Sequence, residues 1–535
     1  MRPQPPAPDG TETEREIRGM ARGGGLNLVG SAGKHVALVA VTFLLAHQLG
    51  RADVGRYAQA IALLAVLETL SLSGVFAALR RFVAVHVADG DHGALRGTVR
   101  LGLSMGTCAS VVLGAALFLT APLLAEEVFR DTGLLLPVRL VALALPFSTY
   151  TQAALAATQG FRTMKPSAFI GLLFEPGLRL ALTVLLLPLA GLDGAMIALV
   201  VGHVAAAALS AVALRRLLGP RRQPPTYNPR ELLGFSMVNW LSTLASTGLL
   251  WVDTLLLGAF LSSADVGLYN VATRLVTMAT FVMPAVNNAF APRIADLHHR
   301  GRSQSLARVY AVAASWNVRL TVPIFGVLLA FPAELLSLFG RGFATAATVT
   351  VILAAGKFVT AATGPCGLML DMSGRPAWSM ANNIAALVAN VLLNLWWIPE
   401  YGIVGSAAAW ALSLTVVNLA RILEVWRIMD MLPFDLASLK GVVAGAGATA
   451  VGLLVNRWLG LPLDLLVGVP ALGLTYLGLM LALGVSAEDR LVFDMVSGRF
   501  RRDGGAQARF RRAPHRVGRP PSDAGVHARV RDADR

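Results

Sequence analysis

Four cationic residues lie inside long apolar stretches of the sequence: Lys34, Arg274, Arg319 and Lys357. A charge near the centre of a bilayer costs at least about 2.5–3.5 kcal/mol, so water, a partner or an anionic ligand must compensate for it. We therefore interpret these residues, and Arg139 with them, as candidate cations of an internal cavity that binds an anion.

Polar side chains accompany these cations at helical spacing. They are Asn27, Ser31 and Lys34 on one helix face, Asn239, Thr243, Ser246 and Asp253 on a second, and Asn270 and Arg274 on a third. Because a polar group is costly in hydrocarbon, such faces are expected to turn toward a cavity or another helix. Asn27, Asn239 and Asn270 are therefore candidate lining residues, with hydrogen bonding between helices as the simpler alternative for each.

Two acidic residues in apolar stretches, Glu68 and Asp253, have no basic residue at helical spacing. Each either takes up and releases a proton or forms a salt bridge to a cation of another helix, such as Lys34. We favour the salt bridge for Asp253 and leave both alternatives open for Glu68.

Other charged residues have a local explanation. Glu175 and Arg179 stand at i, i+4, and Arg421 and Glu424 at i, i+3, so each pair is predicted to neutralise itself along its helix. His203 is interpreted as a packing residue. No cluster of His, Cys, Asp and Glu has metal-ligand spacing, and no Ser/His/Asp set suggests hydrolysis. We therefore expect no metal, no cofactor and no enzymatic activity.

The composition identifies the elements that must hold these residues. Of 535 residues, 55% are hydrophobic and only 14% are charged, whereas a soluble domain carries roughly 25% charged residues. The apolar residues form runs of about 20, enough for a helix to cross the hydrocarbon core. A soluble enzyme is excluded, and the fold class is predicted to be an all-α polytopic membrane protein.

About fourteen transmembrane helices are predicted. They cover 25–47, 57–82, 99–123, 134–157, 167–188, 193–217, 233–259, 267–291, 308–331, 345–370, 377–397, 404–428, 438–458 and 461–484. An even number places both termini on one side, and that side then carries most of the 46 Lys and Arg residues. The charge distribution predicts that both termini are cytoplasmic and that the protein lies in the cytoplasmic membrane.

The sequence contains an internal duplication. Ala-Asp-Val-Gly-Arg-Tyr at 52–57 returns as Ala-Asp-Val-Gly-Leu-Tyr at 264–269, an offset of 212. Lys165-Pro166 and the motif from Pro188 to Ala195 recur at offsets of 210 and 211. Each copy holds six predicted spans, so the copies enter the membrane in the same sense. Two pseudo-symmetric lobes around a central cavity are expected, as in many transporters.

The predicted organisation has six parts. It comprises a cytoplasmic tail at 1–22, an N-lobe at 23–217, a cytoplasmic linker at 218–231, a C-lobe at 232–429, an added helical hairpin at 430–484 and a basic cytoplasmic tail at 485–535. The last tail is expected to be disordered. Its positive charge suits anionic lipid better than nucleic acid, which we exclude as a partner.

The segments 49–57, 252–258 and 264–275 resemble the corresponding parts of polysaccharide flippases in the multidrug/oligosaccharidyl-lipid/polysaccharide (MOP) exporter superfamily. The similarity covers about residues 23–484. It implies two six-helix lobes whose cavity faces inward and outward in turn. The implied substrate is an oligosaccharide on a polyprenyl pyrophosphate. The resemblance further implies that cations in the cavity hold the pyrophosphate group. Lys34, Arg274, Arg319 and Lys357 are the available positions, and only Arg274 lies in a matching motif.

The resemblance leaves alternatives within the same fold. A lipid II-type flippase fits the fourteen-span count. A cation-coupled multidrug exporter would need more acids than bases in its cavity, contrary to the candidates above. A glycan polymerase would need a large outward loop, which the sequence lacks. We expect a monomer whose partners are the lipid-linked substrate, membrane lipids and a coupling proton or cation.

Overall fold

The computed structural model describes residues 30–72, 74–220 and 223–484. All regular elements in these ranges are helices, and no strand occurs among them, as the apolar runs predict. A first helix covers 30–48. The rest of the N-lobe comprises α2 (Arg51–Leu72), α3 (Val75–Asp89), α4 (His92–Leu123), η1 (Leu124–Val128), η2 (Thr132–Leu134), α5 (Leu135–Gly160), η3 (Ser167–Phe174) and α6 (Glu175–Leu218).

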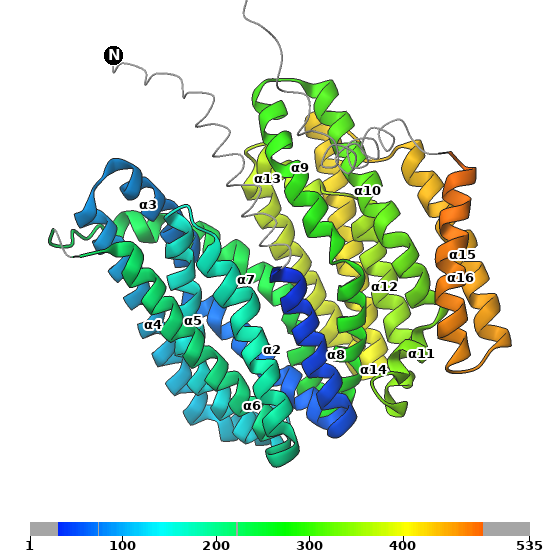
Figure 1. The fold of residues 1–535 in the computed structure, drawn as a ribbon, viewed down its shortest axis with the longest axis horizontal. Coiled ribbons are helices and arrows are strands. Elements are labelled where there is room, and N and C mark those ends of the chain that lie inside the picture. The colour runs from blue at the N-terminus through cyan, green and yellow to red at the C-terminus, as the bar shows by residue number, and fades with distance from the viewer. Residues whose placement is uncertain (1–29, 73, 221–222, 485–535) are drawn as a thin grey trace, which may run out of the picture. The chain divides into compact units, whose positions relative to one another are not determined.

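The C-lobe follows and is drawn in green to yellow in Figure 1. It comprises α7 (Pro229–Phe260), α8 (Ser263–Ala279), α9 (Val282–His299), α10 (Ser303–Ala330), α11 (Pro332–Ser337), η4 (Arg341–Ala346), α12 (Ala347–Ala362), α13 (Cys366–Met372) and α14 (Pro376–Met429). The predicted C-terminal hairpin is formed by α15 (Leu436–Trp458) and α16 (Leu463–Ala482). It packs on α10 through an apolar cluster that includes Val322, Ala448 and Leu472.

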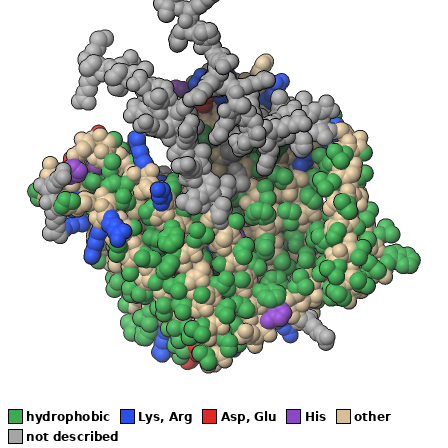
Figure 2. Space-filling view, viewed as in Figure 1, with side chains coloured by type: hydrophobic (Ala, Val, Ile, Leu, Met, Phe, Trp, Pro, Cys, Tyr) green, Lys and Arg blue, Asp and Glu red, His purple; other side chains and the backbone are tan. Residues whose placement is uncertain are grey.

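Ten helices within the described ranges are long and apolar enough to cross a membrane, and α2 with α3 forms a further, bent candidate. Their outer surface is apolar: Leu119 and Leu189 are each 77% exposed. Figure 2 shows hydrophobic side chains over most of the visible face, with Lys and Arg mainly along its upper and left margins. The protein is therefore a multi-pass membrane protein. Because the first predicted span begins outside the described residues, the count of fourteen stays a prediction.

The duplication is visible in the backbone. α6 and α14 are each broken at a glycine with positive φ, Gly191 (φ 55°) and Gly402 (φ 58°), which are repeat-related. Three residues after each break, a Cβ at Gly194 or Gly405 would collide with the carbonyl oxygen eight residues earlier. Eight residues of straight helix span about 12 Å, so the chain folds back at both glycines. The two copies of the repeat thus share the same backbone turn, as the predicted pseudo-symmetry of the lobes requires.

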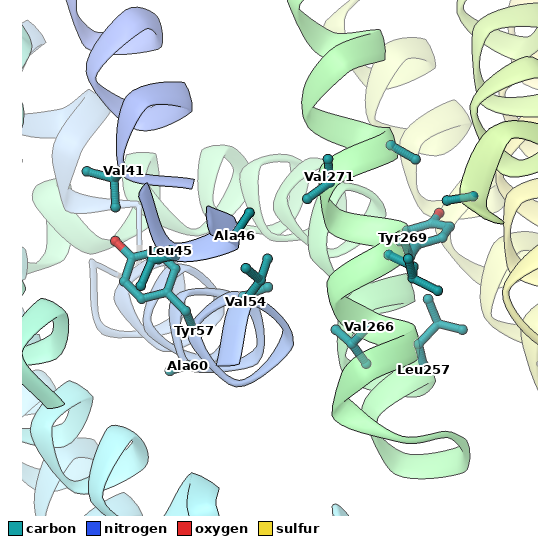
Figure 3. Packing of buried hydrophobic residues seen from close by; sticks show 14 of the residues in the cluster. Val41, Leu45, Ala46, Val54, Tyr57, Ala60, Leu257, Val266, Tyr269 and Val271 are labelled. Atoms are coloured by element: carbon teal, nitrogen blue, oxygen red, sulfur yellow. The ribbon is translucent and has the colours of Figure 1, made fainter. Parts of the chain in front are cut away.

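The two lobes share one apolar core. It joins Val54 and Tyr57 of α2 to Val266 and Tyr269 of α8, and Figure 3 shows these residues on the two helices. The shared core holds the lobes in register, so residues of both can meet at one site.

The linker between the lobes is attached to the N-lobe. The Thr226 amide donates to the Gly93 carbonyl oxygen (3.1 Å), and Arg96 donates to the carbonyl oxygens of Leu218 (2.9 Å) and Gly219 (2.9 Å). α7 then begins behind the N-cap Asn228. The linker therefore fixes the end of the molecule from which α7 starts.

Candidate functional site

A cavity of about 260 Å³ lies among the N-lobe helices. The 30–48 helix, α2, α5, η3 and α6 form its walls, while the C-lobe contributes Trp251 of α7 and Arg274 of α8. Its ionisable lining residues are Lys34, Glu68, Glu175, Arg179, His203 and Arg274. The cavity therefore gathers charged groups on transmembrane helices, away from the lipid-facing surface.

Glu175 and Arg179 form an ion pair of 3.6 Å in the cavity wall. The pair joins successive turns of α6, so the predicted local pairing is confirmed. Their side chains are only 10% and 7% exposed. Because each charge is largely removed from bulk water, each depends on the other for compensation.

Glu68 and Lys34 approach the cavity from α2 and the 30–48 helix. Glu68 faces Ser148 and Gln152 of α5, and its Oε1 is buried without a hydrogen bond from the described residues. Within the described ranges, no ion pair joins Lys34 to a carboxylate. The Lys34 charge nevertheless interacts with that of Glu68, so a cation and an acid face the same cavity without direct contact.

Arg274 stands at the C-lobe side of the cavity. Its Cζ lies 5.8 Å from the centroid of the Trp251 ring, a contact that positions a guanidinium without neutralising it. No carboxylate of the described residues pairs with it. The cavity therefore holds the cations Lys34, Arg179 and Arg274 against two acids, one of which is paired. This charge balance suits an anion.

A second buried polar cluster lies within the C-lobe around Asp253. The carboxylate accepts hydrogen bonds from the Tyr269 hydroxyl (3.1 Å) and the Asn394 amide (2.8 Å), and Asn390 lies beside it. Asp253 is 2% exposed. The favoured salt bridge to Lys34 is wrong, because the carboxylate faces polar groups of its own lobe rather than the N-lobe cavity.

The predicted pair of Arg421 and Glu424 is also wrong. Arg421 Nη2 donates to Asn383 Oδ1 (2.6 Å), while Glu424 Oε2 accepts from Asn382 Nδ2 (2.7 Å). Adjacent asparagines in the first half of α14 therefore separate the two charges. Asn383 in turn donates to Ser246 of α7 (3.0 Å), so this part of the polar face bonds to neighbouring helices.

Comparison with protein families gives two matches. Residues 22–298 match the family described as polysaccharide biosynthesis protein, and residues 240–396 match the MatE family. The first match covers more than half of the chain. The chain belongs to the polysaccharide biosynthesis protein family. The resemblance of its duplicated motif to flippases of the MOP superfamily is thereby confirmed.

Two relatives of this family member come from Haloferax volcanii. The probable low-salt glycan biosynthesis flippase Agl15 is 28% identical over 36% of this chain and 42% of its own. The probable flippase AglR is 25% identical over 49% of this chain and 56% of its own. The chain thus spans about half the length of these relatives.

A solved structure described as the lipid II flippase MurJ in an inward closed conformation shares the fold. It has a TM-score of 0.68 at 12% identity, and the match covers 84% of this chain and 97% of that chain. At this identity the likeness concerns architecture alone, and it agrees with the polytopic two-lobed transporter fold described above.

Of the predicted site residues of this protein, Lys34, Glu68 and Arg274 line the N-lobe cavity. The other predicted residues with described side chains lie elsewhere. Arg139 packs on Phe118 (5.3 Å), Lys357 on Trp410 (5.0 Å) and Arg319 beside Gly441 of α15; Asp253 lies in its own cluster, and Asn270 is buried in α8 one turn from Arg274. Asn27 and the Asn239 side chain lie outside the described residues.

Three ionisable lining residues were missed as site residues: Glu175, Arg179 and His203. For two of them the signal lies in the turn at Gly191, because Arg179 and His203 are each twelve residues from it. Residues equidistant from a tight turn lie level on antiparallel helices. A Cβ at Gly202 would lie 3.6 Å from the Arg179 Cβ, which agrees with this register.

Proposed function

We propose that this protein is a flippase that moves a polyprenyl-pyrophosphate-linked oligosaccharide from the inner to the outer leaflet of the cytoplasmic membrane by alternating access. The observation that carries the proposal is the N-lobe cavity, where Lys34, Arg179 and Arg274 outnumber the acids. The family and the two relatives named as flippases support the same class of substrate.

The charge of the substrate explains why such a cavity is needed. A bare pyrophosphate would cost tens of kcal/mol to move into a low-dielectric slab by the Born estimate. Cations in a hydrated cavity remove much of this cost while the lipid tail stays in the bilayer. Glu175, paired with Arg179, lowers the net positive charge, which keeps binding weak enough for release.

The direction of transport follows from the orientation we propose. With the linker and both termini in the cytoplasm, the basic loops face the anionic inner leaflet. The substrate would then enter from the linker side and leave at the opposite end of α7.

Asp253 and Glu68 are the acids that we propose as coupling groups. Asp253 is surrounded by a hydroxyl and amides rather than by cations, so its charge can be compensated by a bound proton or metal cation. Glu68 lies in the cavity itself, where its charge competes with the substrate for the same cations.

The test is transport by the full chain reconstituted in vesicles with a fluorescent polyprenyl-pyrophosphate glycan. Lys34→Ala and Arg274→Ala are expected to lose at least about 90% of outward translocation, since each removes a cation facing the substrate. Arg139→Ala is the matched control, because Arg139 packs against Phe118 outside the cavity. Equal transport by all three variants would refute the site assignment.

Two parallel measurements distinguish the alternatives within the fold. Lipid II offered to the same vesicles tests whether the peptidoglycan precursor is the preferred cargo. Accumulation of a cationic dye tests the multidrug exporter, and it is expected to be absent because the cavity holds more bases than acids. Dye transport without glycan transport would overturn the proposed function.

A further inference from the structure

The two lobes cross at the duplicated Ala-Asp-Val-Gly motif. A Cβ at Gly55 of α2 would collide with the Ser263 carbonyl oxygen of α8, and a Cβ at Gly267 would collide with the Arg51 carbonyl oxygen. Gly55 and Gly267 are repeat-related, and so are Arg51 and Ser263. The contact is therefore reciprocal, like the interface of a symmetric dimer. Backbone meets backbone here, with no side chain between.

The crossing lies at the end of the lobes opposite the linker. α7 starts at Pro229, directly after the linker, and its 32 residues extend for about 48 Å before α8 begins at Ser263. On the other lobe, α4 begins beside the linker, and α2 and α3 run toward it from Arg51. We call the end at which α2 and α8 cross, opposite the linker, the far side.

Polar side chains fasten the crossing. Asp131, between η1 and η2, accepts hydrogen bonds from Arg56 Nε (2.8 Å) and Nη2 (2.9 Å) in its own lobe. Its Oδ2 also accepts a hydrogen bond from the Ser263 hydroxyl of the C-lobe (2.6 Å). Gln59 Nε2 donates to the same hydroxyl oxygen (3.1 Å). Ser263 therefore bonds to two N-lobe side chains, one of them charged.

We propose that this crossing is the far-side seal of the transporter, and that the hydrogen bonds joining Ser263 to Asp131 and Gln59 are its latch. The proposal rests on the alternating access of the proposed function. Release on the far side requires α2 to separate from α8. Separation breaks the Ser263 bonds but leaves the bond between Arg56 and Asp131 intact, because both belong to the N-lobe. The latch therefore sets the balance between the closed and the separated far side.

The charged part of the latch comes from one copy of the repeat only. Arg56, which orients Asp131, has Leu268 as its counterpart in the second copy. The glycines were duplicated with the fold, whereas the charged group belongs to the N-lobe alone. The seal thus combines a symmetric close contact with an asymmetric polar bond.

The experiment measures far-side distances in the full chain by spin labelling in nanodiscs. Labels at Leu189→Cys and Tyr401→Cys stand beside the repeat-related turns and are 77% and 60% exposed before labelling. Cys108 and Cys366 are first replaced by Ala. Ser263→Ala is expected to raise the ratio of separated to closed molecules by about tenfold, the effect of losing a hydrogen bond to a charged group.

Ser262→Ala is the matched control. Ser262 is the adjacent residue, and its hydroxyl donates to Asp265 within the same helix (2.6 Å). It is expected to leave the distances as in the wild type. Gly267→Ala is expected to abolish the closed distance by steric exclusion, and retained monodispersity shows that this variant folds. A closed distance that persists in both Ser263→Ala and Gly267→Ala overturns the seal.

Failure of this proposal can be told apart from failure of the proposed function. The distances are measured without substrate, so they report the seal even if no lipid-linked glycan is transported. Conversely, normal glycan transport with distances that do not respond to Ser263→Ala would leave the flippase in place and remove the latch.

Discussion

At matched positions of the repeat, the two lobes carry side chains of different polarity and charge. In the C-lobe, Asp253 accepts a hydrogen bond from Tyr269. At the repeat offset, the N-lobe holds Val41 and Tyr57, and the Tyr57 hydroxyl is buried without a hydrogen bond from the described residues. Figure 3 shows Val41, Tyr57 and Tyr269 in the shared core.

The residues around the two matched tyrosines also differ in charge between the lobes. Asn390, beside Asp253, corresponds to Arg179 when the helices are aligned on the turns at Gly191 and Gly402. The tyrosine and the turn glycine are therefore common to both copies, whereas an acid and an amide in one lobe stand where a valine and an arginine stand in the other. The two copies thus share a scaffold but differ in charge: the N-lobe has a cavity lined by more bases than acids, and the C-lobe has a buried acid.

Transplanting the acid is the most direct way to break this division. Val41→Asp places a carboxylate in the N-lobe core beside Tyr57, a residue that itself interacts electrostatically with Arg179. The new acid should pair with Arg179 and compete with the ligand, so affinity for inorganic pyrophosphate is expected to fall at least about tenfold. Isothermal titration of the full chain in nanodiscs measures this. Val41→Asn is the uncharged control, and an equal loss in both variants would assign the effect to packing.

Breaking the ion pair in the cavity wall should lower the free energy of unfolding more than breaking an exposed ion pair. Glu175→Gln leaves the Arg179 guanidinium in a wall where its side chain is 7% exposed. The expected loss is about 3 kcal/mol of unfolding free energy, the low end for breaking a buried pair, because the cavity admits water. Equilibrium unfolding in detergent measures it, and the double variant with Arg179→Gln should recover most of the loss.

An exposed ion pair in the C-lobe provides the reference. Asp296 pairs with Arg300 (2.6 Å), whose side chain is 61% exposed. Asp296→Asn should cost less than about 1 kcal/mol, since water screens such a pair. Similar losses for Glu175→Gln and Asp296→Asn would contradict the burial of the cavity pair.

The latch should respond to pH only under strongly acidic conditions. Burial raises the pKa of Asp131, but hydrogen bonds from Arg56 and Ser263 and the charge of Arg56 outweigh it, so the net pKa is lowered. The latch is present while Asp131 is ionised and is lost as the pH falls through that pKa. The closed far-side population should therefore stay constant from about pH 8 to 5 and decrease only below about pH 4.

Spin-label distances recorded against pH measure this dependence. Asp53, which also pairs with Arg56 (2.8 Å), is the other carboxylate of the cluster. Asp131→Asn should remove the acidic transition while keeping an acceptor for Ser263. A transition between pH 5 and 8 would point to a different titrating group and contradict this account of the latch.

The sequence pattern predicted the features that are set by residues close together in the chain, such as helix ends and ion pairs within one helix. The ends of the predicted spans placed breaks at 188–193 and 397–404, where the repeat-related turns lie, and i, i+4 spacing predicted the pair of Glu175 and Arg179. The cost of burying charge singled out Lys34 and Arg274, which do line the cavity. The pairing of helices was not predictable in this way. His203 joins the cavity only through the fold at Gly191, and Arg319 packs beside α15, a helix outside the repeat for which no counterpart gives a register.

A further pair of small effects separates the two matched tyrosines. Tyr269→Phe removes one of the hydrogen bonds to the buried Asp253 and should cost about 1–2 kcal/mol of unfolding free energy, because the acid is left undersatisfied. Tyr57→Phe removes a hydroxyl that bonds to nothing described in the protein, so it should cost close to zero or stabilise slightly. Chemical unfolding of both variants under identical conditions measures the difference. Equal costs would mean that the Tyr57 hydroxyl has a partner such as bound water, and that the polar chemistry of the two lobes is less divided than their contacts indicate.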